Sequence, residues 1–275
     1  MSNLIPKIIG QVVNVVGHIS PSAAVKLSIF LFSRPRKGQL KTTSNSVLEE
    51  AITKRLTYDQ DIIMTYQWSG SNKRILLAHG WESNSARWEA LVKHLRLDDH
   101  DIIALDAPAH GLSGGHSFNA LLYSKFIEVT INEFQPDVVI GHSVGGMASV
   151  FSKSVINESS VSKMILLGAP DKFTDVLQRY VDMMGYNKNI HYHINKWINV
   201  RYGKTPDYYS TASFSQKISI PQLIIHDEND TVIPFQDAKS ISESSPYANL
   251  ISTTGLGHGL KGKFVYDCIS DFIKS

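Results

Sequence analysis

Short runs of consecutive apolar residues, separated by segments of helical periodicity, most constrain how this chain can fold. The runs read ILLA, DVVI, MILL and QLII, and they begin at Ile75, Asp137, Met164 and Gln222. A strand that is apolar at every position is buried on both faces, as in a parallel sheet covered by helices on both sides. Helical spacing between the runs, as from Ala86 to Leu97, fits the same alternation. The sequence therefore predicts an α/β protein with a mostly parallel sheet and helices on both faces.

Four further strands complete the predicted sheet. Residues 52–57 and 61–68 have the pattern of a hairpin that turns at Tyr58-Asp59-Gln60, and two more strands are expected at residues 101–105 and 250–253. This gives eight strands in all. With 275 residues, of which 43% are hydrophobic, the chain can bury one large core. We therefore expect one domain over residues 46–275, preceded by an N-terminal arm, residues 1–45.

Charge and cysteine content exclude several classes of function. The net charge is +2 and the basic residues are scattered, so we expect no nucleic-acid partner. Cys268 is the only cysteine, which excludes an intramolecular disulfide and fits a reducing compartment, so we expect a cytoplasmic protein. His191 and His193 could bind a metal only with a third ligand, and none is near in the sequence. We expect no metal site.

The N-terminal arm at first resembles a targeting segment, but polar residues interrupt every apolar run. No run approaches the roughly 20 residues that a membrane-spanning helix needs. A first helix is indicated by the spacing of Ile5, Ile8, Ile9, Val12 and Val16, and a second is expected from Ser22 to Phe32, after Pro21. We expect an amphipathic arm folded onto the protein body. The alternative is contact with a membrane surface or a partner, with a basic flank of Arg34, Arg36 and Lys37.

The pentad Gly-x-Ser-x-Gly occurs twice, and only its context distinguishes the two copies. Residues 111–115 follow the polar stretch Asp106-Ala107-Pro108-Ala109-His110 and read as a loop. Residues 141–145 connect a buried strand directly to a helix that begins at Val144. A nucleophilic serine at such a sharp turn has a strained backbone, needs small neighbours two residues away, and lies at a helix N-terminus that favours negative charge. Ser143, and not Ser113, is therefore the candidate nucleophile.

A nucleophilic serine also requires a base and an acid that orients the base. Asp227 and Asp230 follow the strand that begins at Gln222, and His258 lies on a glycine-rich loop after the strand at residues 250–253. The C-terminal ends of parallel strands lie along one edge of a sheet, so these side chains can converge with Ser143. The order serine, aspartate, histidine agrees with the order expected for a nucleophile on this kind of turn.

From about Ile52 to the C-terminus, the chain resembles the α/β-hydrolase fold superfamily, on its serine esterase and lipase-like side. The resemblance rests on separate blocks in the expected order, namely His79-Gly80-Trp81, Asp106 to Ser113, Gly141 to Gly145, Asp230 to Pro234, and His258. It implies that Asp230 is the acid and His258 the general base, with Asp227 as the less favoured acid. It also implies that the backbone N–H groups of Trp81 and Val144 bind an oxyanion. Ala109 departs from the pattern, since glycine is usual there.

The same resemblance implies a helical lid insertion at about residues 171–216. Aromatic and methionine side chains crowd into this segment, and they suggest an apolar roof over the catalytic edge, although each could equally pack in the lid's own small core. They are Tyr180, Met183, Met184, Tyr186, Tyr192, Trp197, Tyr202, Tyr208, Tyr209 and Phe214.

Together these features favour an α/β-hydrolase that acts on a small-molecule acyl substrate. Ser143, His258 and Asp230 would cleave an ester or related acyl compound through an acyl-enzyme intermediate, without a cofactor. Thioesters, amides, lactones and carbon–carbon bonds remain open as substrates. The alternative, from a different class, is a non-catalytic ligand-binding or scaffold protein that retains the fold.

Overall fold

A computed structural model describes residues 4–42, 47–156 and 159–275, and the chain divides into two compact units. The larger, α/β unit comprises residues 35–171 and 211–275, and the smaller, helical unit comprises residues 1–34 and 172–210. The N-terminal segment therefore shares a unit with part of the insertion predicted at residues 171–216. The domain boundary predicted at residues 45 and 46 lies outside the described residues.

The α/β unit is built on an eight-stranded sheet with the order β1-β2-β4-β3-β5-β6-β7-β8. Only the pairings of β2 with β1 and with β4 are antiparallel, and the other neighbours run parallel. The strands are β1 Ile52–Tyr58, β2 Asp61–Trp68, β3 Arg74–Ala78, β4 Asp101–Leu105, β5 Val138–His142, β6 Lys163–Leu167, β7 Gln222–Asp227 and β8 Ala248–Thr253. The mostly parallel eight-stranded sheet predicted from the sequence is thereby confirmed.

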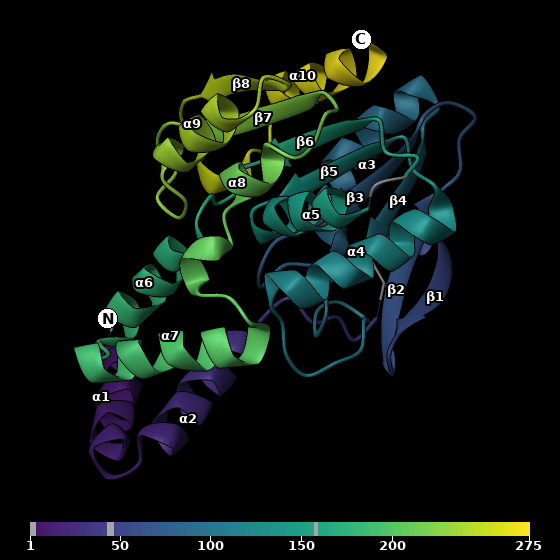
Figure 1. The fold of residues 1–275 in the computed structure, drawn as a ribbon. Helices are drawn as coiled ribbons and strands as arrows, with labels where there is room; N and C mark the ends of the chain where they lie inside the picture. The colour runs from purple at the N-terminus through teal and green to yellow at the C-terminus, as the bar shows by residue number, and fades with distance from the viewer. Residues whose placement is uncertain (1–3, 43–46, 157–158) are drawn as a thin grey trace. The chain divides into compact units, whose positions relative to one another are not determined.

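Helices cover both faces of this sheet (Figure 1). In the view of Figure 1, α4, α5, α8 and α9 lie in front of the sheet, and α3 and α10 lie behind it. The bounds are α3 Glu89–Leu95, α4 Ala120–Phe134, α5 Val144–Val155, α8 Thr211–Ser215, α9 Phe235–Ser244 and α10 Lys263–Lys274. Because both faces are covered, every residue of β4 and β5 is buried, as the continuous apolar runs predict. β1, at the sheet edge, is instead mostly exposed.

The segment with helical spacing from Ala86 to Leu97 is not one continuous helix. It consists of a 3₁₀ turn at Ser85–Trp88, the short helix α3, and a second 3₁₀ turn at Arg96–Asp98. The Asn84 side chain caps the first turn by accepting from the Ala86 N–H, and Asp99 ends the second in a left-handed conformation. Side-chain capping and a positive φ therefore fix the two ends of the segment, and both end turns are 3₁₀ rather than α-helical.

The described residues of the helical unit form four α-helices, α1 Leu4–Ile19, α2 Pro21–Ser33, α6 Phe173–Met184 and α7 Lys188–Tyr202. Ser20 caps α2 and Pro21 is its first residue, which explains the break between the first two helices. Several aromatic and methionine side chains of residues 172–210 pack in this unit's own core, among them Tyr180, Met184 and Tyr186. Among the described residues, no helix is both long and apolar enough to cross a membrane.

Candidate functional site

Ser143 occupies a sharp turn between β5 and α5. Its φ of 54° and ψ of −128° are unusual for a residue with a side chain, and such a conformation costs about 1–3 kcal/mol. The glycines on either side are required because the chain is crowded there. A Cβ atom on Gly145 would lie 2.4 Å from the Ala78 carbonyl oxygen, and one on Gly141 would lie 2.5 Å from Gly146 Cα. The Ser143 N–H also donates to Leu167 O at 2.8 Å, which ties the turn to β6.

The structure brings Ser143, His258 and Asp230 into one hydrogen-bonded row. Ser143 Oγ lies 3.0 Å from His258 Nε2, and His258 Nδ1 lies 2.7 Å from Asp230 Oδ2. Since a carboxylate can only accept, the proton of a neutral His258 must be on Nδ1, and Nε2 is left to accept from the Ser143 hydroxyl. The Ser143 and Asp230 residues are both buried, whereas 21% of the His258 side chain is exposed. His258 is therefore accessible to a substrate, while the Asp230 side chain is kept from water.

Asp230 and Asp227 have different surroundings, although both follow β7. Besides its contact with His258, Asp230 accepts through Oδ1 from the N–H groups of Val232 and Ile233, at 2.8 and 3.0 Å. Its two oxygens are therefore fixed in distinct roles, one facing the loop backbone and one facing the base.

Asp227 instead accepts from the Asn229 N–H, the Thr253 hydroxyl and the Leu256 N–H, at 3.0, 2.8 and 2.8 Å. Burial alone would raise the pKa of Asp227, but these hydrogen bonds outweigh it and hold the pKa below its usual value. The Asp227 carboxylate thus joins the end of β7 to the loop that carries His258.

The glycine-rich loop around His258 is fixed from two more directions. His142 Nε2 lies 2.7 Å from His258 O, and Arg87 Nη2 donates to Gly259 O at 3.1 Å. A carbonyl oxygen only accepts, so His142 carries its proton on Nε2. Burial lowers the pKa of His142 well below its usual value, so the ring stays neutral. In the sequence, His142 matches a motif position that is usually structural or pocket-lining, but its contact with the His258 backbone was not predicted.

A second histidine, His226, contacts Asp230 from the end of β7. Its Nε2 lies 2.9 Å from Ile233 O and 3.3 Å from Asp230 Oδ2. Both neighbours are acceptors, so Nε2 must carry a proton that the two share. The side chains of His226 and Asp230 have no exposed surface. His226 was not among the site residues predicted from the sequence, and no motif signal in the strand distinguishes it from an ordinary buried residue.

The turn at residues 79–82 lies against the serine turn. A Cβ atom on Gly80 would lie 2.8 Å from Ser143 Cβ, so the backbone that leads to Trp81 passes beside the nucleophile. Val144 is the first residue of α5 and directly follows Ser143. The structure thus brings the two segments that carry the predicted oxyanion donors, Trp81 and Val144, next to Ser143. That their N–H groups bind an oxyanion stays a prediction.

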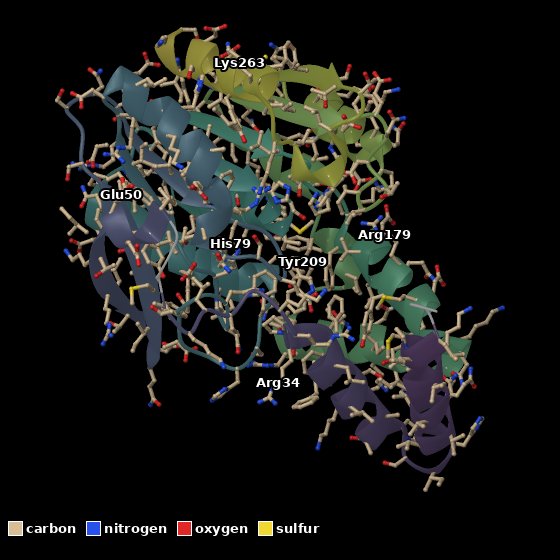
Figure 2. All side chains as sticks on the ribbon, turned by 180° about the vertical axis from the view of Figure 1, so that it is seen from behind. Arg34, Glu50, His79, Arg179, Tyr209 and Lys263 are labelled. Atoms are coloured by element: carbon tan, nitrogen blue, oxygen red, sulfur yellow. The ribbon has the colours of Figure 1, made fainter. Side chains whose placement is uncertain are left out.

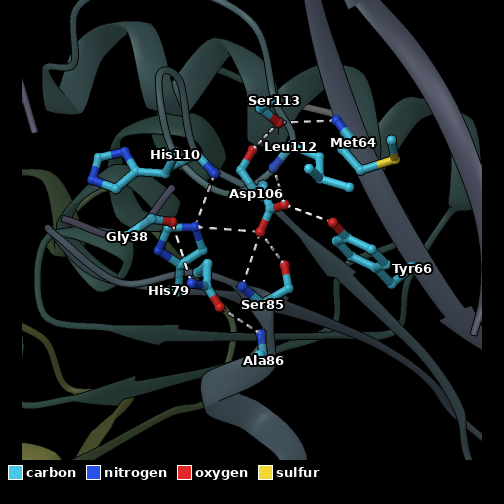
Figure 3. Close-up of polar contacts among 12 residues, drawn as sticks. Gly38, Met64, Tyr66, His79, Ser85, Ala86, Asp106, His110, Leu112 and Ser113 are labelled. Atoms are coloured by element: carbon cyan, nitrogen blue, oxygen red, sulfur yellow. Dashed lines mark hydrogen bonds and ion pairs between the residues drawn. The ribbon is translucent and has the colours of Figure 1, made fainter. Parts of the chain in front are cut away.

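Two neutral histidines hold this turn to the loop that follows β4 (Figure 3). His79 Nδ1 donates to Gly80 O at 2.7 Å, and its Nε2 accepts from the Ala107 N–H at 2.9 Å. Burial lowers the pKa of His79 to about 3. His110 donates through Nδ1 to Pro108 O and accepts through Nε2 from the Glu82 N–H. Because each ring uses one lone pair and one proton, the neutral form of both is required, and the 3.9 Å approach of His79 to Asp106 is not an ion pair.

Asp106 is the centre of a buried hydrogen-bond network that fixes the same loop (Figure 3). Its carboxylate accepts from the Ser85 N–H and hydroxyl, the Tyr66 hydroxyl and the Leu112 N–H, at 2.7–2.9 Å. Burial raises the pKa of Asp106, and these four donors oppose that shift. The network is structural support for the turn at residues 79–82, and none of its members contacts His258.

Ser113, the serine of the other pentad, is fully engaged in this loop. Its hydroxyl donates to Asp106 O at 2.7 Å and accepts from the Met64 N–H at 2.9 Å. Ala109, where the family usually has glycine, keeps the loop conformation with a φ of 61°. The described contacts therefore give Ser113 a role in the loop, and the row with His258 belongs to Ser143.

No group of three or more His, Cys, Asp or Glu residues that could hold a metal ion occurs in the parts of the chain that the structure describes. His191 and His193 lie on α7 of the helical unit.

Comparison with known proteins gives relatives of the same kind. A family model described as the α/β hydrolase fold matches residues 73–189. A bifunctional esterase/perhydrolase from Acinetobacter calcoaceticus is 25% identical over 237 residues, covering 68% of this chain and 85% of that protein. A non-heme chloroperoxidase from Burkholderia pyrrocinia is 24% identical over 258 residues, covering 74% of this chain and 92% of that protein.

Among solved structures, an esterase from Pyrococcus furiosus matches with a TM-score of 0.65 at 16% sequence identity, covering 88% of this chain and 97% of that one. At this identity, the match bears on the fold alone. The family model over residues 73–189, the relatives and the parallel sheet with a serine turn at its centre together show that the chain has the α/β-hydrolase fold.

Proposed function

We propose that this α/β-hydrolase is a serine hydrolase that cleaves an ester or a related acyl compound through Ser143, His258 and Asp230. The row of two hydrogen bonds, 3.0 Å from serine to histidine and 2.7 Å from histidine to aspartate, carries the proposal. A nucleophile, a base and an orienting acid at these distances are what acyl transfer requires. The names of the relatives, which include an esterase/perhydrolase, support an ester as the substrate class.

In the acylation step, Ser143 Oγ bonds to the carbonyl carbon of the substrate as His258 Nε2 takes the hydroxyl proton. Asp230 stabilises the positive charge that His258 gains, and it holds the ring in the tautomer that leaves Nε2 free. The carbonyl oxygen becomes an oxyanion, for which the N–H groups of Trp81 and Val144 and the N-terminus of α5 are the proposed partners. His258 then gives the proton to the leaving group as the carbon–oxygen bond breaks.

In the deacylation step, a water molecule gives a proton to His258 Nε2, and its oxygen attacks the acyl carbon. Ser143 Oγ leaves and recovers the proton from His258, which releases the acid product. No cofactor enters either step. The contacts of Asp230 with the His258 ring and of His142 with the His258 carbonyl oxygen support this mechanism because they fix the base before the substrate binds.

The proposal is tested by labelling with a fluorophosphonate and by turnover of a panel of aryl esters and thioesters. Wild-type protein should be labelled on Ser143, and Ser143→Ala should lose both labelling and turnover. Ser113→Ala is the matched control, since it removes the serine of the other pentad, and it should keep both. Labelling that survives Ser143→Ala would contradict the assignment. A wild-type protein that is neither labelled nor active on any member of the panel would favour the non-catalytic alternative.

A further inference from the structure

Helix α1 exposes the strongly apolar side that an ordinary amphipathic helix would bury. The residues that it buries are Gly10, Val13, Asn14 and Gly17. The exposed side instead carries six large apolar residues, Leu4, Ile5, Ile8, Val12, Val15 and Ile19, which are 54–85% exposed. In a helix that only covers a protein core, such residues face inward. The arrangement of α1 therefore leaves most of its apolar surface in contact with solvent.

Specific contacts hold α1 in this orientation within the helical unit. A Cβ atom on Gly10 would lie 1.7 Å from Met184 O, so only glycine permits the close approach of α1 to the end of α6. Asn14 donates through Nδ2 to Gly185 O at 2.9 Å and accepts through Oδ1 from the Asn187 N–H at 3.0 Å. The Asn14 side chain thus satisfies backbone groups between α6 and α7. Rotating α1 to bury its isoleucines would break these contacts.

The six exposed side chains form one continuous strip along α1. At about 100° per residue, they all fall within an arc of about 100° on the helix surface. Lys7, Gln11 and His18 lie along one border of this arc and are exposed. A strip of this width with a polar border is typical of a helix that lies in the plane of a membrane interface.

Positive charge is concentrated in the same unit. The helical unit has nine lysines and arginines and three aspartates, a net charge of +6. The α/β unit has 18 basic and 22 acidic residues, a net charge of −4, and the two values account for the +2 of the whole chain. No acidic residue occurs in the sequence before Glu49. Lys7 and Lys26 are exposed, as is Arg34, which follows α2 (Figure 2 labels Arg34).

We propose that α1 docks flat on the surface of a lipid bilayer that carries anionic headgroups. The apolar strip would enter the boundary between headgroups and acyl chains, and the basic side chains of the helical unit would be attracted to the surface. A second copy of the chain is disfavoured as the occupant, since two units of +6 repel each other. Whether the α/β unit hydrolyses esters has no bearing on this docking.

The test measures co-sedimentation of the full chain with sucrose-loaded vesicles. Vesicles of phosphatidylglycerol and phosphatidylcholine should bind the protein. Vesicles of phosphatidylcholine alone should bind it with a partition coefficient at least about tenfold lower. Raising the salt from about 0.05 to 0.5 M should weaken binding to the anionic vesicles by about tenfold, because salt screens the attraction to the surface. Equal binding to both kinds of vesicle, or no binding at low salt, would overturn the proposal.

The variant Ile8→Asp/Val12→Asp places two carboxylates in the apolar strip and should lower the partition coefficient at least tenfold. The matched control is Leu97→Asp/Val155→Asp, which adds the same charge at two exposed apolar residues of the α/β unit and should retain nearly full binding. Circular dichroism checks that both variants fold. If both variants lose binding equally, net charge alone explains it and the docking of α1 is wrong. If light scattering shows a wild-type dimer that Ile8→Asp/Val12→Asp dissociates, the strip is a protein interface and the proposal fails.

Discussion

His226 Nε2 lies 3.3 Å from Asp230 Oδ2, the same oxygen that His258 Nδ1 contacts at 2.7 Å. One carboxylate oxygen therefore faces two imidazole rings. His258 is the closer, and the His226 proton is shared with Ile233 O. His226 thus supports the proposed acid through the same oxygen that contacts His258. We regard it as a positioning residue.

His226→Leu should lower kcat by about three- to tenfold, with little change in KM. The effect is small because the contact with Asp230 is long and shared, and because two backbone N–H groups still hold the other carboxylate oxygen. His226→Gln can again offer an N–H to Ile233 O and should recover most of the rate. In an Asp230→Asn background, His226→Leu should cost no further activity, since it acts through Asp230. Rate losses that multiply in the double variant would mean that His226 acts by another route.

Ser113→Ala should lower the free energy of unfolding by about 1–3 kcal/mol and leave kcat within about twofold of wild type. The substitution removes the acceptor of the Met64 N–H and a donor to Asp106 O, in a loop whose backbone is largely buried. Urea unfolding measures the first effect, and turnover of any working ester measures the second. A stable variant with a large loss of kcat would show that the loop contributes to chemistry.

Stability should fall as the pH falls below about 6.5. Burial lowers the pKa of His79 to about 3, and it also lowers the pKa values of His142 and His110. Between these values and 6.5 the unfolded chain binds more protons than the folded one, so acid favours unfolding. Each such histidine contributes a slope of about 1.4 kcal/mol per pH unit. Burial raises the pKa of Asp106, so the protonation of this carboxylate favours the folded state in acid, but it is a single group against the three histidines.

Urea unfolding at pH 7.5, 6.5 and 5.5 measures this slope. The free energy of unfolding should be nearly level between the first two values and should drop between the last two. A constant or rising stability toward pH 5.5 would show that the three rings are protonated in the folded protein, and that their assigned tautomers are wrong.

The features that could be predicted from the sequence are those that depend on neighbouring residues in the chain. The buried strands and the turn at Ser143 depend on residues next to one another in the chain, so apolar runs and glycine spacing identified them. His226 and His142 could not be identified in this way, because their partners, Asp230 and His258, meet them only after the strands are placed side by side. The same limit applied to α1. Apolar periodicity found the helix but not the side it buries, which Gly10 and Asn14 decide through contacts with residues more than 170 positions away.

Replacing each aspartate of the loop after β7 with asparagine should separate their roles. In Asp230→Asn, the side-chain oxygen must stay where it accepts from the Val232 and Ile233 N–H groups. The amide nitrogen then faces His258 Nδ1. Because an amide NH₂ group only donates, Nδ1 can form this hydrogen bond only as the acceptor. His258 is thereby forced into the tautomer that carries its proton on Nε2, and it can no longer accept from Ser143. We expect kcat to fall by about 10⁴, the drop seen when the equivalent acid of a serine protease is neutralised.

In Asp227→Asn, the hydrogen bonds to Asn229, Thr253 and Leu256 lose their charged acceptor, and at least one of these donors loses its partner. The expected loss is about 1–3 kcal/mol of stability, with kcat reduced far less than in Asp230→Asn. Steady-state turnover of one ester, with circular dichroism and thermal unfolding of both variants, makes the comparison. If Asp227→Asn is the inactive variant while Asp230→Asn keeps most of its rate, then Asp227 serves the base, and the 2.7 Å contact between Asp230 and His258 is not the one that catalysis uses.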